Sequence, residues 1–243
     1  MKALILAAGL GTRLRPLTEK TPKPLLPVAG RPMILYPLAF LRGHGIREVI
    51  INIHLQPDQW REALGDGSRL GLHITFSPEP VLLDTGGGIK NAEKFFRGET
   101  LVVLNADTLI ELDLDQVLGA HRRHRPAATL VLKQLPNPAE FSPVLVDAQG
   151  RVRRLRGEPA EIEAAGLQAF TFTGLQILEP EILDALPAGG SACLIRDAYI
   201  PLLRAGREIR AFLMEGYWKS LDTADRIHEA EADLQAGRLL MIA

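Results

Sequence analysis

Short apolar runs alternate with segments of helical pattern along the first half of the chain. Four runs are rich in Ile, Val and Leu, as buried parallel strands are. They are residues 3–7, 49–53, 73–77 and 101–105. Helices are predicted between them, at residues 33–42 and at residues 58–64, where Pro57 suits a first turn. This alternation predicts βαβ units around a largely parallel sheet.

The pattern changes after Asp107. Further apolar runs, and a turn-forming Asp-Ala-Gln-Gly sequence at residues 147–150, predict strands and a hairpin with helices before and after them. The predicted strands are residues 129–134, 144–146, 152–155 and 170–178, and the predicted helices are residues 115–123, 180–186, 195–203 and 223–236. No internal repeat or linker is found, so we expect a single domain over residues 1–243.

Composition narrows the class of partner. The chain has 28 Lys and Arg residues against 29 Asp and Glu, a net charge of −1, so no global field recruits nucleic acid or an anionic membrane. Cys193 is the only cysteine, which excludes an intrachain disulfide and fits a cytoplasmic location. We find no signal peptide, and no apolar stretch approaches the roughly 20 residues of a membrane helix.

A glycine-rich loop with two cations follows the first predicted strand. Gly9 and Gly11 can take positive φ and turn backbone N–H groups toward an anion, while Arg13 and Lys23 supply positive charge. No Walker A string occurs, and Leu14 stands where a dinucleotide fingerprint needs a third glycine. Prolines through residue 27 argue against a long helix here. The loop is therefore predicted to bind phosphate in another way.

The sequence Ala-Ala-Gly-x-Gly-Thr-Arg-Leu-x-Pro-Leu-Thr at residues 7–18, followed by Pro-Lys-Pro-Leu-Leu-Pro-Val at residues 22–28, resembles the signature of the sugar-1-phosphate nucleotidyltransferases. The resemblance extends more thinly over nearly the whole chain. It implies an α/β fold, a three-layer α/β/α Rossmann-like arrangement with a mixed, mainly parallel central sheet. It also implies a nucleotide-binding half at about residues 1–110 and a sugar-binding half at about residues 111–243.

The same resemblance implies roles for the first loop. Arg13 would bind the pyrophosphate part of the nucleotide. Lys23 would bind the α-phosphate and the phosphate of the incoming sugar. Backbone from Ala8 through Gly9 and Gly11 to Thr12 would hold the nucleotide. The direct attack of a sugar phosphate on the α-phosphorus needs charge neutralisation and alignment and no protein nucleophile.

A second glycine-rich segment, Asp-Thr-Gly-Gly-Gly at residues 84–88, is predicted to open a helix that runs through Phe95, with Asp84 or Thr85 as its cap. Its glycines would expose backbone N–H groups to an anion or a base edge. By resemblance, Thr85, Gly86 and Gly87 match the loop that closes on the base. A glycine hinge is the alternative interpretation.

The metal is expected at the end of the strand at residues 101–105. Asp107 lies where ligands bind in open α/β sheets, and Mg²⁺ prefers a few carboxylates together with phosphate oxygens. The resemblance also implies a second metal-binding aspartate in a Trp-x-Asp-x-Gly-Thr string, but this chain has Ser220 at the aspartate position and Asp222 at the glycine position. Three options stay open. Asp222 binds the metal from the same strand face as Ser220, or water takes the place of the missing carboxylate, or the enzyme is impaired.

The sugar-binding residues are also given by resemblance. The lysine of the family's Glu-Lys-Pro element is absent from this chain. Glu158 is therefore carried over, and Arg156 is a candidate substitute for the lysine, with a simply exposed arginine as the alternative. Thr173 and Gly174 match the strand turn that lines the sugar pocket, although a strand bulge would explain that glycine equally. Asn105 completes the predicted set. His54 is left out of it, since a lone histidine at a strand end is more often capped or exposed.

The resemblance implies transfer of NMP from an NTP, either GTP or UTP, to a sugar 1-phosphate, with Mg²⁺ as cofactor and pyrophosphate as product. The short chain looks most like the mannose-1-phosphate guanylyltransferases and the N-acetylmuramate-1-phosphate uridylyltransferases, which serve nucleotide-sugar biosynthesis for the cell envelope. Two alternatives stay open: a cytidylyltransferase of a phosphorylated alcohol or choline, and a regulatory protein that binds nucleotide sugars without turnover. The oligomeric state is also open.

Overall fold

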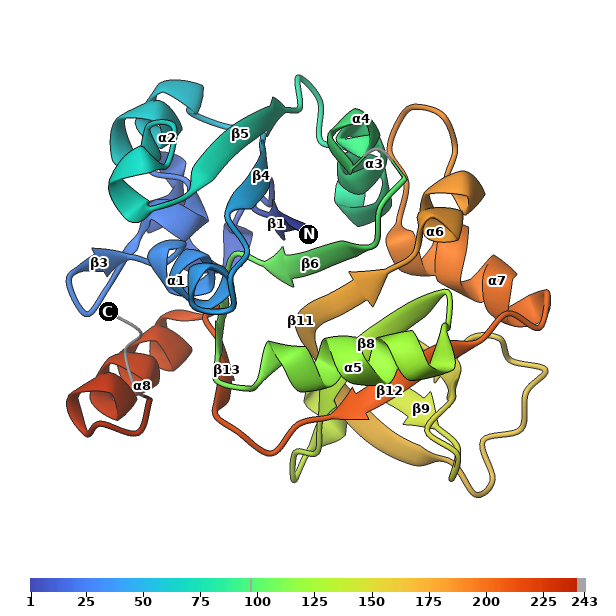
Figure 1. Cartoon of the computed structure of the whole chain (residues 1–243). Helices are drawn as coiled ribbons and strands as arrows, with labels where there is room; N and C mark the ends of the chain where they lie inside the picture. Colours follow the sequence, from blue (N-terminus) through green and yellow to red (C-terminus); the bar gives the residue numbers. More distant parts are fainter. Residues whose placement is uncertain (97, 240–243) are drawn as a thin grey trace. The chain divides into compact units, whose positions relative to one another are not determined.

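The computed structural model describes residues 1–96 and 98–239. The chain forms two compact units, which we call unit 1 and unit 2. Unit 1 contains residues 1–82, 104–112 and 216–243, and unit 2 contains residues 83–103 and 113–215. In Figure 1, unit 1 includes the blue and red ends of the chain. The N-terminal sequence expected to bind nucleotide therefore belongs to one compact unit with the C-terminal helix.

A parallel sheet forms the centre of unit 1. Its strands are β1 (Lys2–Leu6), β4 (Glu48–Ile53) and β5 (His73–Pro78), with β1 paired to β4 and β4 paired to β5. The Ala106 N–H donates to the Leu6 carbonyl over 3.0 Å, so the end of β6 (Leu101–Asn105) lies beside the end of β1. The carboxyl ends of buried strands therefore meet at one edge, as predicted from their apolar runs.

Short turns follow β1 in place of a long helix, because prolines recur through this segment. Three 3₁₀ turns are followed by a small hairpin of β2 (Pro27–Val28) and β3 (Arg31–Pro32). The turns are Thr12–Leu14, Leu17–Glu19 and Lys23–Leu25. This part of the prediction is confirmed.

Helices α1 (Leu35–Gly43), α2 (Pro57–Leu64) and α8 (Ala224–Gln235) belong to unit 1. The predicted Pro57 start of α2 is confirmed. Thr223 caps α8, its hydroxyl oxygen accepting from the Arg226 N–H over 3.4 Å. Helix α1 begins two residues later than the predicted residue 33, and Met33 and Ile34 are fully buried in the turn before it.

A two-stranded ladder of β7 (Thr108–Ile110) and β13 (Trp218–Ser220) was not predicted. Each strand has only three residues, too few for a period-2 pattern to be read from the sequence. The ladder ties the segment after Asp107 to the segment before Asp222. Ser220 ends β13 and Asp222 follows the strand, so a shared strand face, one of the three options that we left open for Asp222, does not describe this position.

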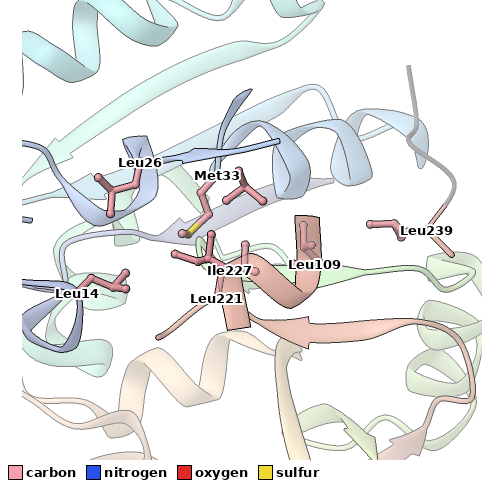
Figure 2. Close-up of a cluster of buried hydrophobic side chains, with 9 residues drawn as sticks. Leu14, Leu26, Met33, Leu109, Leu221, Ile227 and Leu239 are labelled. Carbon is pink, nitrogen blue, oxygen red and sulfur yellow. The ribbon is translucent and has the colours of Figure 1, made fainter. Parts of the chain in front are cut away.

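A cluster of buried apolar side chains joins these elements (Figure 2). Leu14, Leu26 and Met33 come from the N-terminal segment, and Leu109 from β7. Leu221, Ile227 and Leu239 come from the C-terminal part of the chain, and Val28 and Ala230 complete the cluster. Sequence segments that are far apart are therefore fixed to one another inside unit 1.

Unit 2 carries the antiparallel part of the fold. In this unit β11 (Gln168–Leu178) pairs antiparallel with both β8 and β9, while β12 pairs parallel with β8 and β10 antiparallel with β9. These partners are β8 (Ala128–Lys133), β9 (Val144–Val146), β10 (Val152–Leu155) and β12 (Ile209–Leu213). All but β12 were predicted. Unit 1 thus has parallel strands and unit 2 mainly antiparallel ones, which agrees with the mixed strand pairing of an α/β Rossmann-like fold.

The helices of unit 2 correct one prediction. The helix expected through Phe95 is interrupted at Ala92 and forms α3 (Asp84–Asn91) and α4 (Glu93–Phe96). Its N-cap residue is Leu83, and no side chain caps it, so neither Asp84 nor Thr85 is the cap. The other helices of this unit are α5 (Leu114–His124), α6 (Pro180–Ala185), a π-helical turn at Ile195–Tyr199, and α7 (Ile200–Arg204).

No helix within the described ranges combines the length and apolar character that crossing a bilayer requires.

Candidate active site

The first glycine-rich loop begins where β1 ends. The Ala7 N–H donates to Asn52 Oδ1 over 2.7 Å, and Ala8 is buried next to it. Gly11 has φ +61°, whereas Gly9 does not adopt a positive φ, so our prediction of that conformation holds only for Gly11. Space around the Gly9 Cα is open to 4 Å. The loop thus leaves room for a ligand at Gly9 and turns sharply at Gly11.

Gly11 lets the turn at Lys23 approach the loop closely. A Cβ added at Gly11 would lie 2.8 Å from the Lys23 Cβ and 2.9 Å from the Thr18 Cγ2. The Thr18 hydroxyl donates to the Gly11 carbonyl over 2.9 Å and fixes the same contact. The close approach brings Lys23 next to the loop that carries Thr12 and Arg13.

Lys23 is paired with Asp107. Its ammonium group donates to Asp107 Oδ2, and both side chains are largely buried. Backbone also holds Asp107, whose carbonyl accepts from the Leu221 N–H over 2.8 Å. The structure therefore brings two of the predicted catalytic residues into direct contact, at the edge where β1 ends.

Asp222 is paired with two arginines. Arg13 donates to its Oδ2 and Arg226 to its Oδ1, each over 2.6 Å. Burial alone would raise the pKa of Asp222, but the Arg226 hydrogen bond and the charges of Arg13, Arg226 and Lys23 outweigh it and hold the pKa below its ordinary value. Asp222 is therefore a charged carboxylate within the same group of residues.

The apolar cluster of Figure 2 explains how these charged side chains are positioned. Leu14 follows Arg13 in the chain, and Leu221 precedes Asp222. Leu26 and Leu109 each lie within three residues of Lys23 and Asp107 respectively. Because each polar residue has a close chain neighbour in one packed cluster, the backbone that presents it is rigid.

Arg226 was missed by the sequence analysis. It lies in the first turn of α8, four residues after Asp222, and its side chain is only 19% exposed. The sequence offered one signal, since an acidic and a basic residue four apart at a helix start often pair. The expected motif ended at Thr223, however, so no role was assigned beyond it.

Asp107 and Asp222 are the acidic candidates for holding a divalent cation. Among the described residues, no group of three or more His, Cys, Asp and Glu side chains could form a protein-only metal site. Mg²⁺ does not need one, because it binds one or two carboxylates and completes its shell with water and substrate phosphate oxygens. Asp107, whose carboxylate is paired with Lys23 and is 25% exposed, therefore fits this ion.

In unit 2, Gly86 and Gly87 of the second loop are packed against a neighbouring segment. A Cβ on Gly86 would lie 2.7 Å from Leu186 Cδ2, and a Cβ on Gly87 would lie 2.7 Å from the Gly190 carbonyl oxygen. The Thr85 hydroxyl accepts from the Leu194 N–H over 3.1 Å. These glycines therefore have a packing role within unit 2, whatever ligand their backbone meets.

The residues predicted to bind the sugar are divided between the two units. Asn105 ends β6 in unit 1, while Glu158, Thr173 and Gly174 belong to unit 2. Glu158 pairs with Arg204 over 3.2 Å, and the Thr173 hydroxyl donates to the Val131 carbonyl over 2.8 Å.

A bulge explains the local geometry at Gly174, which has φ +89° where the β11 register with β8 shifts. Arg156 is exposed in the turn that follows β10. Unit 1 thus gathers the phosphate and metal candidates, and no described contact joins the sugar candidates of unit 2 into one cluster.

His54, which we left out of the site, contacts backbone. Its Nδ1 lies 2.7 Å from the Glu79 carbonyl oxygen, and Glu79 accepts from Asn52 Nδ2 over 2.8 Å. Since Asn52 also holds the Ala7 N–H, this network supports the end of β1.

Comparison with known proteins agrees with this arrangement. The Nucleotidyl transferase family model matches residues 2–237. The chain is 34% identical over 236 residues to a mannose-1-phosphate guanylyltransferase of Mycobacterium tuberculosis, covering 97% of this chain and 65% of that protein. It is 37% identical over 240 residues to an N-acetylmuramate alpha-1-phosphate uridylyltransferase of Neisseria meningitidis serogroup B, covering 96% of this chain and 97% of that protein.

Other relatives are longer. A UTP--glucose-1-phosphate uridylyltransferase of Synechocystis is 34% identical over 231 residues, and the match covers 90% of this chain but 59% of the relative. Among solved structures, HddC from Yersinia pseudotuberculosis complexed with GMP-PN has a TM-score of 0.79 at 21% identity, covering 96% of this chain and 99% of that chain, which supports the fold. The family match over residues 2–237 shows that this chain belongs to the Nucleotidyl transferase family.

Proposed function

We propose that this protein transfers NMP from an NTP to a sugar 1-phosphate and releases pyrophosphate. The observation that carries the proposal is the cluster of three cations and two carboxylates in unit 1, Arg13, Lys23, Arg226, Asp107 and Asp222. The cations can neutralise the reacting phosphates, and the two carboxylates can bind the divalent ion that accompanies such phosphates. The similar guanylyl- and uridylyltransferases support the same reaction class.

In this proposal the cations act on charge that builds up during transfer. Arg13, a planar donor with a 65% exposed side chain, takes the departing pyrophosphate. Lys23 carries a compact charge that is held near Asp107, and it neutralises the α-phosphate and the attacking sugar phosphate. Backbone of Ala8, Gly9, Gly11 and Thr12 holds the nucleotide at the end of β1. No protein nucleophile is required, since alignment and charge stabilisation supply the acceleration.

Asp107 and Asp222 are the proposed Mg²⁺ ligands, with Asp107 as the main one. The bound ion would neutralise phosphate charge and orient the α-phosphate for in-line attack. Asp222 has one oxygen toward Arg226 and one toward Arg13, so it reaches the ion only through the oxygen that Arg13 occupies. This arrangement supports Asp222 over Ser220 as the replacement for the missing aspartate.

The substrates are proposed as GTP or UTP with a hexose or amino-sugar 1-phosphate. The full-length match to the Neisseria uridylyltransferase favours the UTP pair, and the match to the Mycobacterium guanylyltransferase favours the GTP pair. We assign base contact to Thr85, Gly86 and Gly87, and sugar contact to Asn105, Glu158, Thr173 and Gly174. Since NTPs are made and held in the cytoplasm, that is the proposed location.

The test is pyrophosphate release from four NTPs, each with mannose 1-phosphate, glucose 1-phosphate and N-acetylmuramate 1-phosphate, with Mg²⁺ and with EDTA. We expect one nucleotide and one sugar phosphate to exceed all other pairs, and EDTA to abolish release. Asp107→Asn should lower the rate at least about a hundredfold, since it removes metal and charge together.

Other results identify the alternatives. CTP with phosphocholine as the best pair would indicate the cytidylyltransferase. Tight binding of a nucleotide sugar without release from any pair would indicate a binding protein and would contradict transfer.

A further inference from the structure

Each cation proposed to hold phosphate is paired with a carboxylate proposed to hold the metal. Arg13 lies 2.6 Å from Asp222, and Lys23 contacts Asp107. The groups that should bind substrate and metal are therefore bound to each other. A polyphosphate that approaches without a metal must compete with a carboxylate for each of these two cations.

The two ion pairs of Asp222 differ in how easily each arginine can leave. The Arg226 side chain is 19% exposed and comes from α8, whereas the Arg13 side chain is 65% exposed and comes from a 3₁₀ turn. Solvent competes well for an exposed guanidinium, and a buried one resists release. Arg226 can therefore keep Asp222 charged and oriented on Oδ1 after Arg13 has left Oδ2.

The pair of Lys23 and Asp107 can separate for a different reason. The Asp107 side chain is 25% exposed, and its backbone carbonyl accepts from the Leu221 N–H, so the backbone that carries the carboxylate is held. The Lys23 side chain is only 12% exposed, so solvent does not draw it away from Asp107. Its ammonium lies on a flexible stem of four carbons and can turn from Asp107 to a phosphate oxygen bound in the same site without moving the backbone that Gly11 holds. Lys23 also lowers the pKa of Asp222 through its charge, so the two pairs form one electrostatic group.

We propose that Mg²⁺ and the two cations exchange places at Asp107 and Asp222, so that the metal releases Arg13 and Lys23 to the triphosphate. The proposal rests on the function proposed above and adds how that site is controlled. The charges balance: one divalent cation replaces two monovalent cations at two carboxylates, and the freed cations pair with phosphate oxygens. Arg226 is the positioning residue that stays in place throughout.

This exchange makes polyphosphate binding and metal binding cooperative. By linkage, each ligand raises the affinity for the other by the same factor, about tenfold or more for coupling of ordinary strength. Carboxylates that merely ligate the metal predict something different. They would leave metal-free binding unchanged when they are removed.

Titration calorimetry with inorganic tripolyphosphate in EDTA separates these cases, because this probe has no base or sugar. We compare the full-length wild-type chain with Asp107→Asn, Asp222→Asn and the double variant, after checking each fold by circular dichroism. The freed cations should tighten metal-free binding by about tenfold in the double variant. Glu181→Gln is the control. It breaks an exposed pair with Arg207 in unit 2 at a similar distance of 2.7 Å and should change nothing.

Simple removal of negative charge could also strengthen anion binding. The gain from Asp222→Asn is therefore measured again in an Arg13→Gln background, and the gain from Asp107→Asn in a Lys23→Gln background. Exchange predicts that each gain is lost when its cation is absent. A gain that persists without the cation, or no gain at all, would overturn the proposal.

Wild-type protein gives an independent measurement if a variant fails to fold. The guanidinium ¹⁵N resonances of Arg13, assigned with Arg13→Lys, should shift when Mg²⁺ is added alone, while those of Arg226 keep the signature of an ion pair. An unchanged Arg13 resonance at saturating Mg²⁺ would contradict exchange.

The experiments distinguish a failure of the proposed transferase function from a failure of the proposed exchange. Pyrophosphate release with no gain in tripolyphosphate binding would support the transferase and remove the exchange. The reverse result would leave the exchange and remove the transferase.

Discussion

At the residue scale, Gly11 is the position where the candidate site depends most on the absence of a side chain. Its φ is +61°, and a Cβ there would lie 2.8 Å from the Lys23 Cβ. Gly9, two residues earlier, has neither a positive φ nor an atom within 4 Å of an added Cβ. The two glycines look alike in the motif, but only Gly11 has a positive φ and close neighbours that leave no room for a Cβ.

We therefore predict that Gly11→Ala lowers the free energy of unfolding by about 1–3 kcal/mol, through backbone strain and the clash with Lys23. Gly9→Ala is the matched control and should change it by less than about 0.5 kcal/mol. Urea denaturation at pH 7 measures both. Equal effects at the two glycines would show that the close approach of Lys23 is not what requires Gly11.

Sequence reasoning found Arg13, Lys23 and Asp107 because they belong to a motif or end a strand. It could not show that Lys23 pairs with Asp107, since these residues are joined only through the fold. It missed Arg226 altogether, because the expected string ends before α8 and a surface helix turn is normally rich in such charges. Long-range ion pairs carry no local signal in one sequence.

At the element scale, helix α3 depends on glycines that allow close packing. A Cβ on Gly86 would meet Leu186 Cδ2 at 2.7 Å and the Ala192 carbonyl oxygen at 2.9 Å. Gly119 in α5 has no such neighbour within 4 Å. These positions give a pair of helical glycines with opposite expectations.

Gly86→Ala should destabilise the protein by about 1–3 kcal/mol, because the added methyl group overpacks the contact. Gly119→Ala should stabilise it by up to about 1 kcal/mol, because alanine is the better helix former and meets no obstacle. Thermal unfolding, monitored by circular dichroism, measures the change in stability of both variants and shows whether each is a gain or a loss. Stabilisation by Gly86→Ala would mean that α3 does not pack as described.

The attachment of α8 depends on Asp233. Its carboxylate accepts from Tyr217 over 2.8 Å, and it pairs with Lys219 over 2.7 Å and with Arg238 over 2.9 Å. The hydrogen bond from Lys219, with those from Tyr217 and Arg238, holds the pKa of Asp233 below its ordinary value despite desolvation. A depressed folded pKa stabilises the protein above the unfolded pKa, and this stabilisation is lost as the pH falls through the folded pKa.

Asp233→Asn should therefore cost about 1–2 kcal/mol at pH 7, and the difference from wild type should shrink below about pH 4. Denaturant unfolding from pH 3 to pH 8 tests this. Glu229→Gln removes the more exposed partner of the same Lys219, at 3.2 Å, and should cost less than about 1 kcal/mol. A pH-independent difference for Asp233→Asn would contradict the ionic account.

Most elements were predictable because their patterns are long or strongly apolar, as in β1, β4, β6 and α5. Strands β7 and β13 were not, since three residues show no period and only their partner defines them. The break between α3 and α4 was missed as well, because no proline or glycine occurs at Ala92 to mark it.

At the scale of the whole molecule, residues far apart in sequence form one compact unit. Unit 1 unites residues 1–82 with residues 216–243, and the apolar cluster of Figure 2 packs both ends of the chain together. The two halves expected from the sequence, divided near residue 110, follow the order of the chain. Packing in the structure instead places the C-terminal helix α8 in the same unit as the N-terminal sequence that is expected to bind nucleotide. Only tertiary packing, such as the apolar cluster that includes both Leu26 and Ile227, could reveal this grouping.

The central claim is that the protein transfers a nucleotide and does not merely bind one. The direct measurement uses an NTP labelled with ³²P at the α-phosphate, chosen from the most active pair, together with Mg²⁺ and its sugar 1-phosphate. We predict that label enters an NDP-sugar in a one-to-one ratio with released pyrophosphate, and that none is transferred without the sugar phosphate. Label that stays in the bound NTP, or leaves only as free NMP, would contradict the account.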